Sequence, residues 1–164
     1  MDSLAIRYVR KEDLDNCYAV EISCFAPSAA ATKDRIKLRI ETFPQGFLVA
    51  EINGKIVGMI NSSSINEESL ADEALTQMAN FVPDGKNVVV FSLCVLPEFR
   101  GKEISRRLLE TFIELSKKLG KKKILLLCKE NLIKYYEKFG FTCLGKSKSQ
   151  HGGFEYYEMS FLLK

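Results

Sequence analysis

Residues 87–128 carry the pattern that most limits what this chain can fold into. NVVVFSLCV (87–95) is a nearly continuous apolar run, typical of a central strand covered on both faces, and ILLLC (124–128) is a second buried run. Between them, apolar residues recur at helical spacing from Ile104 to Leu119. Two parallel strands joined by a helix form a right-handed βαβ unit. The sequence therefore predicts an α/β domain.

Further strand and helix patterns flank this unit on both sides. The dipeptide Asn53-Gly54 between two apolar runs is a strong hairpin signal. Thr32 precedes a helical pattern and can cap it through its hydroxyl. The predicted elements are, in chain order, a strand over 4–9, a helix over 11–24 (apolar at Leu14, Cys17, Tyr18 and Ile22), a helix over 32–42, the hairpin strands, a helix over 67–81, the βαβ unit, a short helix over 130–139 and two final strands. We expect one α/β domain over residues 1–164, with a mixed central sheet of about six to seven strands flanked by helices.

The composition limits the classes of function open to the chain. Of its 164 residues, 46% are hydrophobic and 27% charged, and the net charge of +3 is too small to indicate nucleic acid or an anionic membrane as a partner. The five cysteines show no C-x-x-C spacing, which argues against a disulfide scaffold and a metal site and favours a reducing compartment. No run approaches the roughly 18 apolar residues of a membrane helix, and the N-terminus is charged too early for a signal peptide. We therefore expect a soluble cytoplasmic protein.

The turn between the first buried strand and its helix is a candidate anion site. Arg100, Gly101 and Lys102 place two cations and a glycine at the predicted helix start. The unpaired backbone N–H groups of a helix start and its positive dipole end favour a phosphate or a carboxylate. The spacing fits neither a P-loop nor a dinucleotide fingerprint. On these residues alone, a solvated turn is the alternative.

Two segments of the chain resemble the GNAT superfamily of N-acetyltransferases. They are VLPEFRGKEISRRLLE, at the helix start, and NLIKYYEKFGF, which follows the second buried strand. Within that superfamily, EISCF with PSAAATKD, and FGF with GKSKSQHGGFEYYEM, look most like the arylalkylamine N-acetyltransferase branch. The resemblance covers essentially the whole chain. It implies an acetyl-CoA-dependent acyltransferase that moves an acetyl group to a primary amine.

The resemblance also implies that the anion at the turn is the pyrophosphate of acetyl-CoA. Backbone N–H groups of residues 100–105 would hold it, and the pantetheine arm would pair with the preceding strand as an added strand does. Backbone N–H groups near Cys94 and Val95 are the candidate donors to the acetyl carbonyl oxygen. The residues implied in cofactor binding are Leu93, Cys94, Val95, Arg100, Gly101, Lys102, Glu103, Ile104, Ser105 and Asn131.

Glu103 and Ser105 depart from the family pattern, which has glycine at the first position and glycine or alanine at the second. A carboxylate next to pyrophosphate is electrostatically unfavourable. We expect Glu103 to be an ordinary helical residue that needs no positive φ and turns outward to Arg106 and Arg107, at i+3 and i+4. Ser105 can donate its hydroxyl to a phosphate oxygen.

Tyr136 is the candidate general acid for the departing thiolate, because it matches the tyrosine that precedes Gly-Phe in the family pattern. Helix geometry favours it over the adjacent Tyr135. Leu132, Tyr136 and Phe139 share one buried face, whereas Tyr135 points about 100° away. A tyrosine that only packs against the sheet is the alternative.

The general base has no match in the family pattern. The strand positions that correspond to the histidines of the arylalkylamine branch, Val89–Phe91, hold no titratable side chain. His151 lies in a glycine loop and is the candidate base, with a plain surface residue as the alternative. A water chain or Glu21 is the other route. Cys94 lies beside the expected thioester, but an inert buried thiol is the better interpretation because no histidine partner is visible.

The acceptor site is the least determined part of the sequence. Phe25 and Pro27, together with Phe43 and Phe47, either wall an apolar pocket for the amine or belong to the core. The lysines of 117–123 are better explained by the dipole of a helix C-terminus than by nucleic-acid binding. We expect a small-molecule amine acceptor and a monomer or homodimer. The rival hypothesis is a non-catalytic acyl-CoA-binding or sensor module on the same fold.

Overall fold

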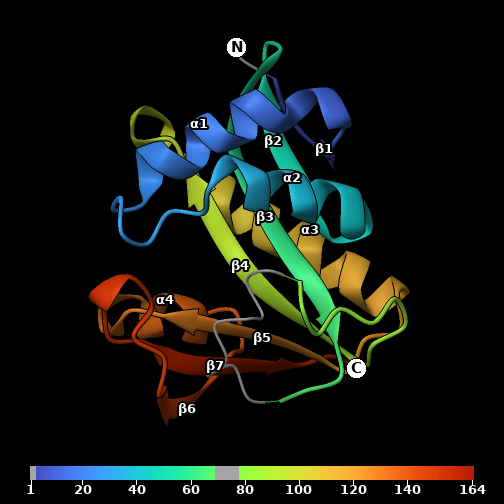
Figure 1. Ribbon diagram of the computed structural model, residues 1–164, viewed down its shortest axis with the longest axis vertical. Helices are drawn as coiled ribbons and strands as arrows, with labels where there is room; N and C mark the ends of the chain where they lie inside the picture. Colours follow the sequence, from blue (N-terminus) through green and yellow to red (C-terminus); the bar gives the residue numbers. More distant parts are fainter. Residues whose placement is uncertain (1–2, 69–77) are drawn as a thin grey trace.

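A computed structural model of the protein describes residues 3–68 and 78–164. It shows a seven-stranded mixed sheet with helices on both faces (Figure 1), which confirms the predicted α/β class. The strands are β1 (Leu4–Tyr8), β2 (Leu48–Ile52), β3 (Lys55–Ile65), β4 (Asn87–Val95), β5 (Lys123–Cys128), β6 (Thr142–Lys146) and β7 (Tyr157–Leu162). The helices are α1 (Leu14–Cys24), α2 (Lys33–Thr42), α3 (Ile104–Lys118) and α4 (Ile133–Glu137), with short 3₁₀ turns η1 (Lys11–Asp13), η2 (Pro44–Gly46), η4 (Pro97–Phe99), η5 (Glu130–Leu132) and η6 (His151–Gly153).

The sheet has the order β1-β2-β3-β4-β5-β7-β6. Only β4 and β5 pair in parallel; the other described pairs are antiparallel. Helices α1 and α2 cover one face and α3 covers the other, while α4 lies over the β6–β7 part (Figure 1). The predicted βαβ unit is thus present, and α3 supplies its apolar face, including the fully buried Leu108 and Phe112.

Local signals in the sequence set several of these elements. Asn53 and Gly54 both have positive φ, 50° and 80°, which is the conformation of the turn type that matches the twist of a hairpin. Thr32 caps α2, and its hydroxyl accepts a hydrogen bond from the backbone N–H of Arg35 at 3.3 Å. Both predictions are confirmed, because each depends only on residues close together in the chain.

Three residues predicted to lie on buried helix faces are exposed in the structure. Ile22 is 51% exposed; Cys17 is buried as predicted, and Val20 and the carboxylate of Glu21 complete the buried face of α1. Leu119 and Leu132 are also exposed, because each lies just outside the helix that was expected to bury it. The helix predicted over 67–81 falls largely on 69–77, which lie outside the described residues.

A divergence of β4 from β5 creates the main irregularity of the sheet. Their parallel pairing ends at Val90 and Leu126, although β4 continues to Val95 and β5 to Cys128. The register of β4 against β3 also shifts between Ser92 and Val90, so that Phe91 forms a β-bulge. Figure 1 shows the two strands separating toward the ends that carry α1 and α4. The last residues of β4 therefore have a free edge.

None of the helices within residues 3–68 and 78–164 is both long enough and apolar enough to cross a bilayer.

Candidate functional site

The free edge of β4 exposes backbone groups from alternate residues. The N–H of Leu96 donates to the carbonyl of Val57 on β3 at 2.8 Å. Along a strand, the N–H and C=O groups of every second residue point to the same side, so those of Cys94 also point toward β3. Leu93 and Val95 therefore direct their N–H and C=O groups toward the gap beside β5. Of the three strand residues predicted to bind the cofactor, these two present an unpaired strand edge, and the expected backbone donor at Cys94 faces away.

Two side chains reach the carbonyl oxygen of Val95 at this edge. Arg100 donates from Nε at 3.0 Å, and the thiol of Cys24 donates at 3.3 Å. Arg100 therefore folds back over the end of β4 rather than extending from the turn. Lys102 is exposed, with Nζ 5.4 Å from the centre of the Phe99 ring.

The turn before α3 has a backbone shape that suits an anion. Gly101 has φ 78°, and apart from its own chain neighbours no atom lies within 4 Å of the position that a Cβ would take there. Glu103 has φ 61° and ψ 21° and is the N-cap residue of α3, so the helix begins only at Ile104. Left-handed residues next to helical ones bring successive backbone N–H groups together into a concave anion-binding nest.

The conformation of Glu103 corrects the expectation that it is an ordinary helical residue. Its positive φ explains why glycine is the residue that suits this position without strain. The outward orientation is confirmed, because its carboxylate pairs with Arg106 at 2.7 Å on the exposed surface. Arg107 contacts Glu103 through its backbone instead, by the N–H bond to the Glu103 carbonyl at 3.1 Å.

The two tyrosines of α4 have different environments, as the helix geometry predicted. Tyr136 is buried and packs edge-to-face against Tyr135 and Phe141. Burial, with smaller contributions from Cys128 and other neighbours, raises the pKa of Tyr136 well above its ordinary value, so the hydroxyl stays protonated. Tyr135 is half-buried, and its hydroxyl bonds that of Ser105 at 2.6 Å. Ser105, predicted to meet a phosphate, is therefore already paired.

The remaining predicted residues lie on the segment after β5, on the loop between β6 and β7, and on the loop between α1 and α2. Asn131 is exposed in η5, just after β5. His151 is half-buried in η6 and bonds the carbonyl of Ala29 through Nε2 at 2.9 Å, so Nε2 carries the proton. Through this contact the structure brings His151 against the α1–α2 loop, where Phe25 is half-buried and Pro27 exposed. Phe43 and Phe47, by contrast, are buried in the core.

A cluster of buried polar side chains lies next to this loop. Glu21 is the one member of this cluster that was predicted from the sequence as a functional residue. The carboxylate of Glu21 accepts from the hydroxyl of Ser92 and from the N–H of Ala31, both at 2.8 Å. Arg39 lies alongside and donates to Asn61 at 3.1 Å and to Ser92 at 3.4 Å.

Arg39 is only 3% exposed and lies over the ring of Phe91. Burial lowers its pKa to about 10, despite the nearby charge of Glu21. Its Nε has no hydrogen-bond partner among the described residues. One feature of the sequence could have predicted that Arg39 is buried: it lies between Ile36 and Ile40 on the apolar stripe of α2.

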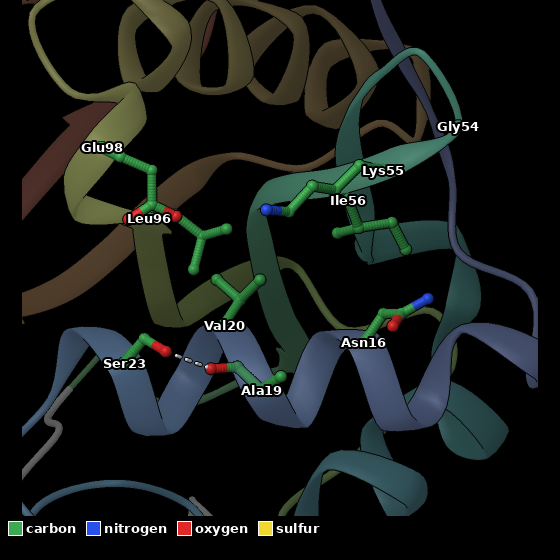
Figure 2. Close-up of a pocket in the computed structure, with 9 residues that line it drawn as sticks. All are labelled: Asn16, Ala19, Val20, Ser23, Gly54, Lys55, Ile56, Leu96 and Glu98. Atoms are coloured by element: carbon green, nitrogen blue, oxygen red, sulfur yellow. Dashed lines mark hydrogen bonds between the residues drawn. The ribbon is translucent and has the colours of Figure 1, made fainter.

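A pocket of about 440 Å³ lies between α1, the β2–β3 hairpin and the segment that follows β4 (Figure 2). Residues of α1, of the β2–β3 turn with the start of β3, and of the segment after β4 line it, including Lys55 and Glu98. None of the residues predicted for the site lines it, and its one drawn hydrogen bond, from Ser23 to Ala19, lies within α1. Residues 3–68 and 78–164 hold no cluster of three or more metal-ligating side chains.

The divergence of β4 from β5 and the turn before α3 frame the candidate site of this α/β domain. Residues 8–141 match the sequence profile of the Acetyltransferase (GNAT) family. The chain belongs to this family.

Curated relatives resemble the chain over part of their own length. It is 28% identical to "Probable hydrolase YhcX" of Bacillus subtilis over 130 residues, 75% of this chain and 25% of that protein. It is also 28% identical to "Uncharacterized N-acetyltransferase YkwB" of Bacillus subtilis over 126 residues, 70% of this chain and 56% of that protein. The chain therefore spans about a quarter and about half of these two relatives.

Solved structures show the same fold at low identity. The loading GNATL domain of CurA from Lyngbya majuscula matches with a TM-score of 0.87, 20% identity and 98% coverage of both chains. The GphF GNAT-like decarboxylase in complex with isobutyryl-CoA matches with a TM-score of 0.84 and 18% identity, covering 98% of this chain and 100% of that one. YncA from Salmonella typhimurium, solved with its cofactor acetyl-CoA, matches with a TM-score of 0.70 and 17% identity, covering 99% and 95%.

Proposed function

We propose that the protein is an acetyl-CoA-dependent N-acetyltransferase that moves an acetyl group to a primary amine by direct attack in a ternary complex. The observation that carries this proposal is the edge of β4 beyond Val90, which no longer pairs with β5 and leads to the backbone nest before α3. Tyr136 of α4 is the acid proposed to act beside this edge. Family membership and the acyl-CoA complexes of YncA and GphF support it.

The cofactor would use groups that the fold already orients. The pyrophosphate lies against the N–H groups of the turn from Gly101 to Ser105, with Lys102 beside it. The pantetheine amides pair with the backbone of Leu93 and Val95. Because Arg100 and Cys24 both hold the Val95 carbonyl in this structure, binding must displace at least one of them.

The transfer step then follows from the site. The amine nitrogen attacks the thioester carbonyl carbon, and strand N–H groups at the free edge stabilise the charge that develops on its oxygen. The carbon–sulfur bond breaks, and Tyr136 gives its proton to the departing thiolate. Its protonated, buried hydroxyl suits this role.

The base takes the proton that the amine loses. Glu21 is the candidate that the structure favours over His151, because Glu21 contacts Ser92, directly beside Leu93 on the free edge. His151 contacts the α1–α2 loop, so its role in this proposal is to shape the acceptor site. Membership of the arylalkylamine branch and a small-molecule acceptor remain predictions.

The direct test is turnover with a panel of primary amines. Purified protein is mixed with acetyl-CoA, and free thiol is measured with and without each amine. We expect thiol release that depends on the amine, together with a mass gain of one acetyl group on the amine. Acetyl-CoA binding without thiol release for any amine would instead favour the acyl-CoA sensor.

The anion site is tested by a pair of variants at Gly101. Gly101→Asp and Gly101→Asn have nearly the same shape, and both side chains tolerate positive φ, so only the charge differs. We expect Gly101→Asp to weaken acetyl-CoA binding at least several-fold more than Gly101→Asn, measured by calorimetry. Equal affinities would place the anion elsewhere.

A further inference from the structure

Cys24 and Cys94 meet at the free edge of β4. Cys24 ends α1 and is half-buried, whereas Cys94 lies on β4 and is buried. The side chain of Val95 lies on the α3 face of the sheet, next to Leu108, so that of its neighbour Cys94 points to the opposite face, which α1 covers. The Cys24 thiol, at the end of α1, bonds the carbonyl of Val95 at 3.3 Å. The fold thus brings two thiols from distant parts of the chain close together.

The surroundings of the pair make its two members chemically unequal. The neighbouring Cys94 thiol and the guanidinium of Arg100 lower the pKa of Cys24 to about 7, against the opposing effects of burial and of Glu21. The contact with Cys24, together with burial, raises the pKa of Cys94 well above its ordinary value. At neutral pH a fraction of Cys24 is therefore thiolate, which gives up the bond to the Val95 carbonyl, while Cys94 keeps its proton.

We propose that Cys24 and Cys94 form a redox-active dithiol that hydrogen peroxide converts to an intramolecular disulfide. The Cys24 thiolate attacks one peroxide oxygen, the O–O bond breaks, and the leaving hydroxide takes a proton to become water. The resulting sulfenic acid on Cys24 is attacked by the Cys94 sulfur, which loses its proton as a second water departs. Two electrons pass from the thiols to the peroxide, and one S–S bond forms.

The other cysteines provide a contrast within the same chain. Burial raises the pKa of Cys17 to about 12 and that of Cys128 to about 11. Both therefore stay protonated and unreactive at neutral pH. A thiol with a pKa about two units below its ordinary value reacts roughly fivefold faster at pH 7, since the larger thiolate fraction outweighs its lower nucleophilicity.

One consequence rests on the proposed function. The disulfide fixes the end of α1 against the edge where the pantetheine arm is expected to pair. We therefore expect the oxidised protein to bind acetyl-CoA at least tenfold more weakly than the reduced protein, and bound acetyl-CoA to slow oxidation.

The test is mass spectrometry of the reduced protein after one equivalent of hydrogen peroxide at pH 7. The expected product is lighter by about 2 Da and yields a Cys24–Cys94 linked peptide in a non-reducing digest. Free thiols fall from five to three, since one disulfide consumes two. Alkylation of Cys24 by iodoacetamide should reach half its maximal rate near pH 7. Oxidation of Cys128 as fast as Cys24, or no linked peptide, overturns the proposal.

Variants separate the two roles. In Cys94→Ser, oxidation of Cys24 should stop at the sulfenic acid, which dimedone traps. In Cys24→Ser, the rapid oxidation should disappear. Cys128→Ser is the control and should react as the natural protein does. Trapping on Cys143 in place of Cys24 would contradict the assignment. The linked peptide is detected without any acyl transfer, so it supports the dithiol even if no amine is acetylated. If the reduced protein acetylates an amine but forms no linked peptide, the dithiol proposal is wrong and the proposed function is unaffected.

Discussion

The left-handed backbone at Glu103 concentrates strain on a single residue. A side chain with a Cβ costs about 1–2 kcal/mol in this region, whereas glycine adopts it freely. The exposed pair with Arg106 returns little of that energy, since surface ion pairs contribute about 0–1 kcal/mol. The residue therefore lowers the stability of the turn that it occupies.

Glu103→Gly is expected to raise stability, which reverses the effect expected for glycine inside a helix. The free energy of unfolding should rise by about 1 kcal/mol, or roughly 2–4 °C in Tm, measured by calorimetry without ligand. Glu103→Ala keeps a Cβ at positive φ and loses the ion pair, so it should show no gain. Equal Tm values for the two variants would argue against strain at this residue.

Tyr136→Phe keeps the ring packing and removes only the proposed acid. We expect kcat to fall by roughly 10²-fold, with a smaller change in KM for acetyl-CoA. Tyr135→Phe is the matched control, because it removes the adjacent hydroxyl that bonds Ser105. A larger kcat loss in Tyr135→Phe would move the acid to that residue.

At the scale of elements, one arginine joins β1, η1 and β2. Arg7 donates to both carboxylate oxygens of Asp13, at 2.8 and 3.1 Å, and to Glu51 at 3.1 Å. Burial alone raises the pKa of Asp13, but the hydrogen bonds from Arg7 and Arg10 outweigh it and hold that pKa below its ordinary value. Folded Asp13 binds fewer protons than unfolded Asp13, so this contribution to stability is present at neutral pH and is lost in acid.

Asp13→Asn should therefore lower the free energy of unfolding by about 1–3 kcal/mol at pH 7. The difference from the natural protein should shrink as pH falls below about 4, where unfolded aspartate takes up its proton. Urea unfolding across this range measures it. Asp15→Asn is the control, because Asp15 is exposed and its pair with Lys33 lies on the surface. A difference that stays constant with pH would exclude the ionic contribution.

At the scale of the whole molecule, two loops connect the halves that the β4–β5 divergence separates. Ser28 donates to the carbonyl of Gly152 at 2.9 Å, next to the contact of His151 with Ala29. A Cβ on Gly152 would approach the Cβ of Ala29 and the carbonyl oxygen of Ser28 to 2.9 Å each. The contact therefore depends on glycine at this position.

Gly152→Ala should push the two loops apart and raise KM for the amine several-fold, with little change in acetyl-CoA affinity. Gly153→Ala is a matched control, because Gly153 also has positive φ but faces open space. Steady-state kinetics and calorimetry distinguish them. If both variants behave alike, backbone strain rather than loop contact explains the effect, and the loops do not shape the acceptor site.

Short-range features of the sequence were sufficient for much of this fold. The Asn53-Gly54 turn, the Thr32 cap and the burial of Tyr136 follow from residues within a few positions of one another, and so does each strand and helix of the βαβ unit. Helical and strand periodicity and turn chemistry are local properties, so a single sequence determines them.

Tertiary contacts decided the rest. Cys24 and Val95 are 71 residues apart, as are Glu21 and Ser92, and His151 and Ala29 are 122 apart. No periodic pattern encodes which of two distant polar groups will meet, because that depends on how the layers pack. The positive φ of Glu103 is of the same kind: α3 begins at Ile104, where packing of its apolar face against the sheet fixes the helix and leaves Glu103 to complete the turn.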